Sequence, residues 1–128
     1  MTQIQSIHSL ISNIKQGQKN NLSNINVIYS KLNIDILNVL YEEGYISDFE
    51  IKKNADNKDI ISVRLKYYNN ISAIRNIQRV INKHISLKLL NQIDLGLVTY
   101  ILSTSKGIFS GKEARRLNLG GTILLIVW

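Results

Sequence analysis

Two stretches in the first half of the chain carry apolar residues at the spacing of an α-helix. Between residues 4 and 14, apolar side chains recur at steps of three and four, which places them along one side of a helix. Thr2 can cap the start of this helix, and Gly17 can end it in a left-handed conformation. A second helix is predicted to follow Ser30, a suitable N-cap, and to stop at Gly44.

Alternating apolar and polar residues predict three strands around these helices. Residues 24–29 alternate, and they predict a strand between the two helices. Residues 45–51 and 60–67 predict a hairpin, because the segment between them, residues 54–59, is polar and charged. The first half therefore reads helix–strand–helix–strand–strand, with helices packed on a small sheet.

The second half is predicted to be mainly β. Asn69 and Asn70 mark a change in composition and are the predicted domain boundary. Ser110 and Glu113 have the spacing of a capping box, which predicts the start of one short helix. Strands are predicted at residues 77–81, 86–89, 96–102 and 122–127.

The predicted fold class is α+β, with two small domains. Residues 1–69 would form the N-terminal α/β domain. Residues 70–128 would form a mainly β domain with one short helix, and this second domain carries the strongest candidate site.

The charge balance favours a polyanionic partner. The formal net charge is +7 and the isoelectric point is near 9.7, as in many proteins that bind nucleic acid or acidic membrane surfaces. A basic surface without a partner is the plainer alternative. The chain has no Cys and only two His, so neither a disulfide framework nor a metal site is expected, and no cofactor is implied.

Composition also bears on where the protein works. Ile, Asn, Lys and Tyr are abundant while Pro is absent, which is typical of an AT-rich genome. No apolar run approaches the roughly 20 residues of a membrane span. The N-terminus resembles neither a signal peptide nor an Arg-rich transit peptide, so an organelle protein would be made inside its organelle.

The richest candidate site lies near the C-terminus. Residues 102–108 form a hydroxyl-rich turn that contains Lys106, and Arg115 and Arg116 follow on the predicted short helix. Hydroxyl donors, backbone N–H groups and cations are the groups that grip a phosphate backbone. Each has a plainer reading: Ser and Thr can bond to the nearby backbone, an Arg pair can be a solvated face, and Gly120-Gly121 can be a simple turn.

The order of these motifs resembles the C-terminal signature of the S-eight family of small-subunit ribosomal proteins. That signature runs from a Ser-Thr-Ser-Lys-Gly turn through Glu-Ala-Arg and Gly-Gly to a terminal Trp, as residues 103–128 do. Residues 10–18, 30–32 and 38–46 are similar to further elements of the family, in the same order. The resemblance therefore covers nearly the whole chain.

The resemblance implies a primary rRNA-binding protein that binds the central domain of small-subunit rRNA and helps to assemble the subunit. Lys106 would pair with phosphate, and the family usually has Glu where this chain has Thr122. Arg115 and Arg116 would support or touch the RNA. Close contacts would come from Ser103, Thr104, Ser105, Gly107, Gly120, Gly121 and Thr122. A second contact edge on the first domain would comprise Asn13, Lys15, Gln16 and Lys31.

The resemblance also implies neighbouring proteins of the small subunit as partners, such as S-five and S-twelve. The location implied is a mitochondrial ribosome, with a plastid or an AT-rich bacterium as alternatives. The rival function is a free-standing RNA-binding translational regulator on the same fold. An enzyme is not expected, because the chain has neither a nucleophile elbow nor a phosphate-binding glycine loop. Residues 81–90 depart from the family, which has a basic Pro-Gly turn there, so no contact is carried onto them.

Overall fold

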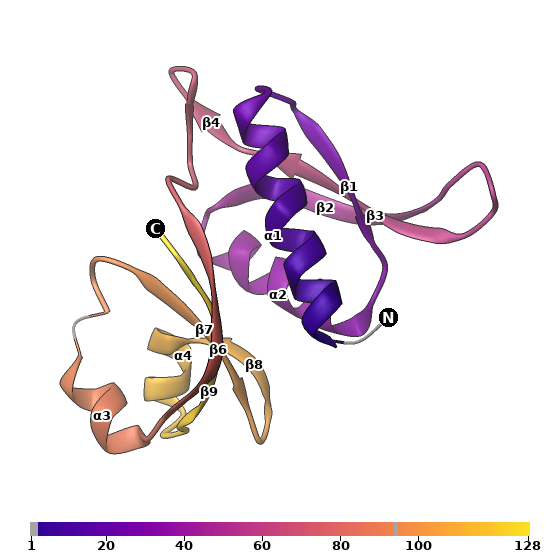
Figure 1. Ribbon diagram of the computed structural model, residues 1–128. Helices are drawn as coiled ribbons and strands as arrows, with labels where there is room; N and C mark the ends of the chain where they lie inside the picture. The colour runs from indigo at the N-terminus through magenta and orange to yellow at the C-terminus, as the bar shows by residue number, and fades with distance from the viewer. Residues whose placement is uncertain (1–2, 94) are drawn as a thin grey trace. The chain divides into compact units, whose positions relative to one another are not determined.

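The computed structural model describes residues 3–93 and 95–128 (Figure 1). Contacts group the chain into two compact units, Met1–Arg75 and Asn76–Trp128. The first unit combines helices with a three-stranded sheet, and the second is mainly β with short helices. The predicted α+β class is confirmed. The predicted domains, residues 1–69 and 70–128, stay a prediction.

Helix α1 spans Gln3–Lys19 and buries its apolar stripe. The prediction that Gly17 ends this helix was wrong, because Gly17 lies inside it. A Cβ atom at Gly17 would overlap the Ile25 Cγ2 methyl and lie 3.1 Å from Leu65 Cδ1, so the glycine lets α1 pack closely on the sheet. The helix instead ends at Lys19, and Asn21, two residues further on, has a φ of +52°. The predicted cap Thr2 lies outside the described residues.

Helix α2 spans Lys31–Glu42, and both predicted ends are confirmed. The Ser30 hydroxyl accepts a hydrogen bond from the Asn33 backbone N–H at 3.0 Å, as an N-cap does. At the other end Gly44 has a φ of +84°, and the Tyr45 N–H donates to the Leu40 carbonyl at 2.9 Å. This arrangement is a Schellman motif, which satisfies carbonyls that the helix leaves free.

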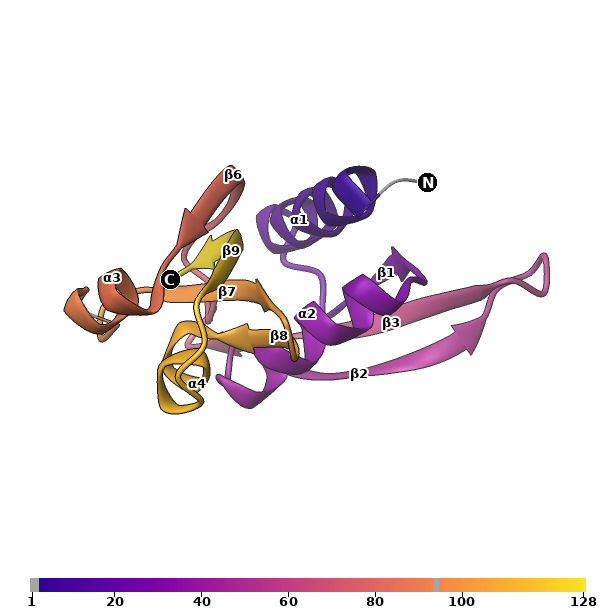
Figure 2. The same cartoon turned by 90° about the horizontal axis from the view of Figure 1, so that it is seen from below.

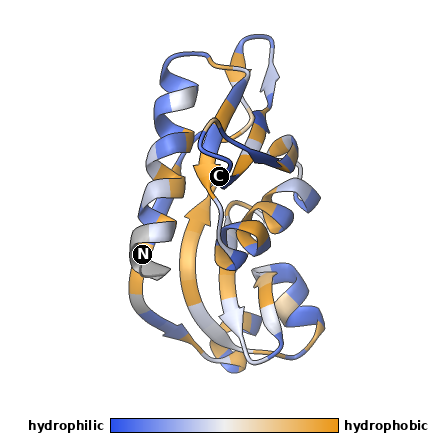
Figure 3. Ribbon diagram, turned by 90° about the vertical axis from the view of Figure 1, so that its right-hand side faces the viewer, coloured by the Kyte–Doolittle hydropathy of each residue, from blue (hydrophilic) through white to orange (hydrophobic). Residues whose placement is uncertain are grey.

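The sheet of the first unit is antiparallel in the order β1-β3-β2. Its strands are β1 Asn24–Ile28, β2 Ile46–Lys53 and β3 Asp59–Leu65, so the predicted strand and hairpin are confirmed. Alternate residues of β1 and β3 are buried, which turns one face toward the helices. The tip of the β2–β3 hairpin extends past both helices in the two views (Figures 1 and 2). In Figure 3 the helix beside the N label, α1, carries both hydrophilic and hydrophobic segments along its length.

A small hairpin closes the first unit. Strands β4 Tyr67–Tyr68 and β5 Ile71–Ser72 pair antiparallel. Asn69 and Asn70 form the two-residue turn with φ values of +52° and +65°. Two successive positive φ values are typical of the type I′ turn, which Asn tolerates better than most residues. The change in composition at Asn69-Asn70 therefore marks a turn.

The second unit is a four-stranded antiparallel sheet in the order β6-β9-β7-β8. The strands are β6 Ile77–Ile85, β7 Thr99–Thr104, β8 Gly107–Ser110 and β9 Gly121–Val127. The strand predicted at residues 86–89 was wrong. That segment begins helix α3, Leu87–Gln92, because the Ser86 hydroxyl caps it by accepting from the Leu89 N–H at 3.2 Å. With α4, Gly111–Arg116, the described part of this unit has two short helices where one was predicted.

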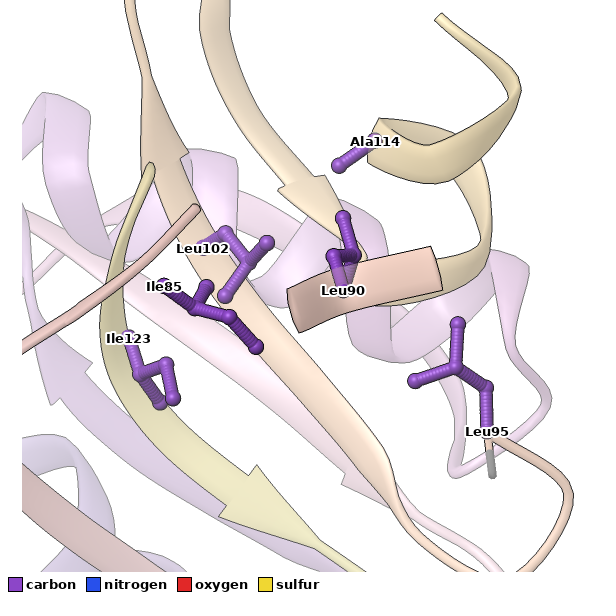
Figure 4. Close-up of a cluster of buried hydrophobic side chains, with 6 residues drawn as sticks. All are labelled: Ile85, Leu90, Leu95, Leu102, Ala114 and Ile123. Atoms are coloured by element: carbon purple, nitrogen blue, oxygen red, sulfur yellow. The ribbon is translucent and has the colours of Figure 1, made fainter. Parts of the chain in front are cut away.

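Both short helices cover one face of this sheet. Leu90 of α3 and Ala114 of α4 are fully buried against apolar residues of the strands. Figure 4 shows their side chains gathered over the sheet. The core cluster comprises Ile85, Leu90, Leu95, Leu102, Ala114 and Ile123. On the opposite face the paired residues Ile101 and Leu125 are also fully buried, and polar side chains follow only at the end of the strands, at Ser103 and Thr122.

We expect Gly17→Ala to destabilise the protein, although alanine is the better helix former. The helix propensity gain is about 1 kcal/mol, whereas overpacking a core costs about 1–3 kcal/mol. The obstructing Ile25 methyl sits on a β-branched side chain that cannot rotate away freely. Urea unfolding measures the change, with Ser12→Ala at an exposed position of the same helix as the control. A Gly17→Ala protein more stable than its parent would contradict this packing.

Candidate nucleic-acid interface

The hydroxyl-rich turn is the tip of the β7–β8 hairpin. Thr104 pairs with Gly107, so Ser105 and Lys106 form a two-residue loop. The Thr104 hydroxyl donates to the Gly107 carbonyl at 2.8 Å and accepts from the Lys106 backbone N–H at 3.2 Å. Gly107 has a φ of +132°, which a residue with a side chain rarely adopts. The turn therefore fixes its own shape, and the hydroxyl of Thr104 serves the protein.

Two side chains at this tip are left for a partner. Ser105 and Lys106 are exposed, and within residues 3–93 and 95–128 neither side chain has a hydrogen-bond or ion-pair partner. The sequence placed both in the candidate site, and the structure shows them next to each other at the tip of the β7–β8 hairpin. A hydroxyl and an ammonium group in this arrangement can bind a base edge, a 2′-hydroxyl or a phosphate.

Close packing of the protein's own backbone requires glycine at positions 120 and 121. A Cβ atom at Gly121 would overlap the Ser103 carbonyl oxygen, and one at Gly120 would lie 2.7 Å from the Ile85 carbonyl oxygen. Both glycines therefore let β9 approach its neighbours at the end of the sheet that carries the turn. Their direct contact with RNA stays a prediction.

The register of the sheet brings together residues that are far apart in sequence. Ser103 of β7 lies opposite Thr122 of β9, and Thr122 lies opposite His84 of β6. Thr122 and His84 are exposed, and Ser103 is partly buried. Sequence spacing could not reveal this row, because it depends on the order of the strands in the sheet.

Arg115 serves to join the two short helices. Its guanidinium donates to the Leu90 carbonyl, at 3.1 Å from Nε, and to the Ile93 carbonyl, at 2.6 Å from Nη2. Both carbonyls belong to the end of α3, where a cation also complements the helix dipole. The geometry thus favours a positioning role for Arg115 over the predicted RNA contact.

Arg116 forms an exposed ion pair with Glu113, three residues earlier on α4. The hydrogen bond from Arg116 lowers the pKa of the Glu113 carboxyl, and the same contact raises the pKa of Arg116. The contribution of this pair to stability is therefore present above the unfolded-state pKa of Glu113, and it is lost as the pH falls through the folded-state pKa. The Ser110 hydroxyl caps α4 by accepting from the Glu113 N–H at 3.2 Å, as predicted.

The second predicted edge lies on the helices of the first unit. Lys15 and Gln16 are exposed on α1, a helix without acidic residues, and neither has a side-chain partner in the described part of the chain. Asn13 donates to a backbone carbonyl of β1 at 3.3 Å. Lys31 pairs with Asp35 at 2.7 Å, and this hydrogen bond raises the pKa of Lys31. Lys15 and Gln16 are thus the members best placed to meet a ligand.

The positive charge of the chain is concentrated in its second unit. Residues 76–128 contain seven Lys and Arg against two acidic residues, whereas residues 1–75 contain nine against seven. Among the described residues, no three His, Asp or Glu side chains are grouped as metal ligands would be. No helix in that part of the chain is both long enough and apolar enough to cross a bilayer.

We expect Arg115→Ala to lower the free energy of unfolding by about 1–3 kcal/mol, since hydrogen bonds to a charged group lie in that range. Arg116→Ala should leave stability nearly unchanged, because exposed ion pairs contribute little. Thermal and urea unfolding of the two variants provide the comparison, and each variant is the control for the other. If both variants lost the same free energy of unfolding, the hydrogen bonds from Arg115 to α3 would not be the stabilising contacts.

The sequence of the chain is similar to known proteins of one family. The family model described as Ribosomal protein S8 matches residues 5–128. A protein of Rhizobium leguminosarum bv. trifolii named Small ribosomal subunit protein uS8 is 34% identical over 132 aligned residues, which cover 100% of both chains. Its namesake in Ureaplasma parvum serovar 3 is 35% identical over 131 residues, covering 95% of this chain and 96% of the relative. The chain therefore belongs to the ribosomal protein S8 family, whose members are structural, non-enzymatic constituents of the small ribosomal subunit.

Proposed function

We propose that this small-subunit protein is a primary rRNA-binding protein that binds the central domain of small-subunit rRNA through the β7–β8 turn. The observation that carries the proposal is the exposed pair Ser105 and Lys106, held on a hairpin whose shape Thr104 fixes. The surrounding unit has an excess of five positive charges, counting Lys and Arg against Asp and Glu. This charge favours a polyanion near the turn.

The two exposed side chains have different tasks. A serine hydroxyl both donates and accepts, so Ser105 can read a base edge or a 2′-hydroxyl where an RNA helix is irregular. Lys106 is a compact cation that pairs with phosphate without reading sequence. Because the turn is already ordered by the Thr104 hydroxyl, little conformational entropy is lost on binding.

Other predicted contacts have graded support. Ser103 and Thr122 stand next to the turn with polar side chains, and Gly107, Gly120 and Gly121 keep the backbone close there. Lys15 and Gln16 are unpartnered within the described residues and support a second contact on α1. Asn13 and Lys31 already have intramolecular partners, which a phosphate would have to displace.

Neighbouring proteins and the cellular location extend the proposal. Exposed large apolar side chains in the first unit, such as Tyr41 and Ile51, support contact with other small-subunit proteins, for which S-five and S-twelve are proposed. The AT-rich type of composition supports a mitochondrial ribosome. The relatives named above are bacterial, so detecting this chain by mass spectrometry in purified mitochondrial ribosomes is the deciding measurement.

We expect Ser105→Ala to weaken binding to the cognate RNA by about 1–3 kcal/mol, the scale for leaving a buried partner unsatisfied. Its effect on the salt dependence should be small, because no charge is lost. Lys106→Ala should weaken binding to many RNAs alike and reduce the salt slope by about one unit. Filter binding uses a central-domain hairpin of Rhizobium leguminosarum small-subunit rRNA and a scrambled hairpin. If the Ser105→Ala protein binds the hairpin as tightly as the parent, the role of the turn is structural and RNA recognition lies on another surface.

We further expect the protein to stay with small subunits when ribosomal particles are sedimented in high salt. A primary rRNA-binding protein is held by specific contacts as well as by screened charges, so it remains bound when counterions compete. A translational regulator would be stripped from the particles, and that result would favour the rival function. Immunodetection across the gradient fractions gives the measurement.

A further inference from the structure

A polar row crosses one end of the second sheet, on the face that α3 and α4 do not cover and where Ile101 and Leu125, further along the strands, are fully buried. His84 of β6, Thr122 of β9 and Ser103 of β7 are consecutive cross-strand partners, so their side chains leave the same face of the sheet. Helices α3 and α4 cover the other face, where Ile85, Leu102 and Ile123 lie in the core. The row ends one residue from Thr104, at the base of the turn.

The row is accessible and unoccupied by the protein's own groups. His84 and Thr122 are exposed, and in the described part of the chain none of the three side chains has a hydrogen-bond partner. Strands in a sheet are about 4.8 Å apart, so His84 lies roughly 10 Å from Ser103 across two strand spacings. A single RNA strand passing the turn can therefore reach both ends of the row.

The net charge of this unit favours an anion at the row. Lys83 on β6 and Lys88 on α3 are exposed and add to that charge, although Lys83 pairs with Ile123 and so leaves the sheet on the face opposite His84. Among the described residues of this unit, the sole carboxylate side chain is Glu113, which is engaged by Arg116. A histidine ring has at least one N–H donor in either protonation state, so it can donate to an oxygen of a phosphate or a 2′-hydroxyl.

We propose that the rRNA-contacting surface extends from the β7–β8 turn across this row to His84, whose ring donates to a backbone oxygen of the same RNA. The inference rests on the proposed function and deepens it, because it adds a residue and a sheet face to the site. It also gives a role to the stretch where this chain departs from its family and where sequence reasoning carried no contact.

The absence of cysteine allows a direct test. His84→Cys, Ser105→Cys and Leu89→Cys proteins are each labelled with an iron chelate and bound to the central-domain hairpin of Rhizobium leguminosarum small-subunit rRNA. Hydroxyl radicals from position 84 should cut the RNA within a few nucleotides of the cuts from position 105. Leu89 is exposed on α3, over the covered face, and should give no cuts. Cuts from position 105 without cuts from position 84 would overturn this inference alone.

Binding of unlabelled variants supplies the energetic test. We expect His84→Ala to weaken hairpin binding about three- to tenfold, the effect of one hydrogen bond worth roughly 0.5–1.5 kcal/mol. His84→Gln retains a donor and should restore most of the affinity. His8→Ala, which changes the other histidine of the chain at an exposed position of α1, should bind like the parent.

The outcomes separate the two proposals. Parent-like binding by His84→Ala would remove His84 from the site and leave the turn as the recognition element. A parent protein that fails to bind the hairpin at all would overturn the proposed function, and this inference with it. Replacing 2′-hydroxyls with deoxyriboses in the hairpin shows which oxygen is used, since the effect of His84→Ala disappears in that RNA if the partner is a 2′-hydroxyl.

Discussion

The close approach of β9 to β7 at Gly121 is the constraint on which the rest of the second unit depends. The backbone of Gly121 comes so near the Ser103 carbonyl that no side chain fits between them. This contact sets the position of Thr122 opposite Ser103, and with it the row that leads to His84. It also fixes the base of the hairpin that presents Ser105 and Lys106. A substitution at Gly121 would therefore disturb the site even where it touches no ligand.

Much of the fold could be predicted from spacing alone, and the failures have physical causes. The two long helices and the β2–β3 hairpin follow from clear periods of 3.6 and 2. The prediction that Gly17 ends α1 was wrong because sequence alone does not distinguish two kinds of glycine. One kind ends a helix, and the other lets a neighbouring strand pack closely against the helix. The strand predicted at residues 86–89 was wrong because a six-residue helix has too few turns to show a helical period. Ser86 gave no further signal, since serine is as acceptable in a strand as at a helix N-cap.

The candidate site was predictable where it is local. The turn at residues 103–107 is contiguous in sequence, and its family resemblance identified it at once. Arg115 could not be assigned, because the carbonyls it binds lie 22 and 25 residues earlier and belong to a helix that was not predicted. His84 was likewise out of reach, since its neighbours are set by strand order. Local motifs indicate which residues are available, while the sheet decides which of them meet.

The left-handed asparagines have a consequence for how such a chain tolerates mutational bias. Five asparagines among the described residues have positive φ values, including Asn21 just after α1 and the Asn69-Asn70 turn. Asn is the residue after Gly that accepts this conformation most readily, and it leaves the unfolded chain with less freedom than Gly does. Mutational bias toward Asn codons can therefore replace glycine by asparagine in such turns while the turn conformation is kept. Gly120 and Gly121 cannot be replaced by Asn in this way. At these two positions the structure requires the absence of a side chain, whatever the backbone angle.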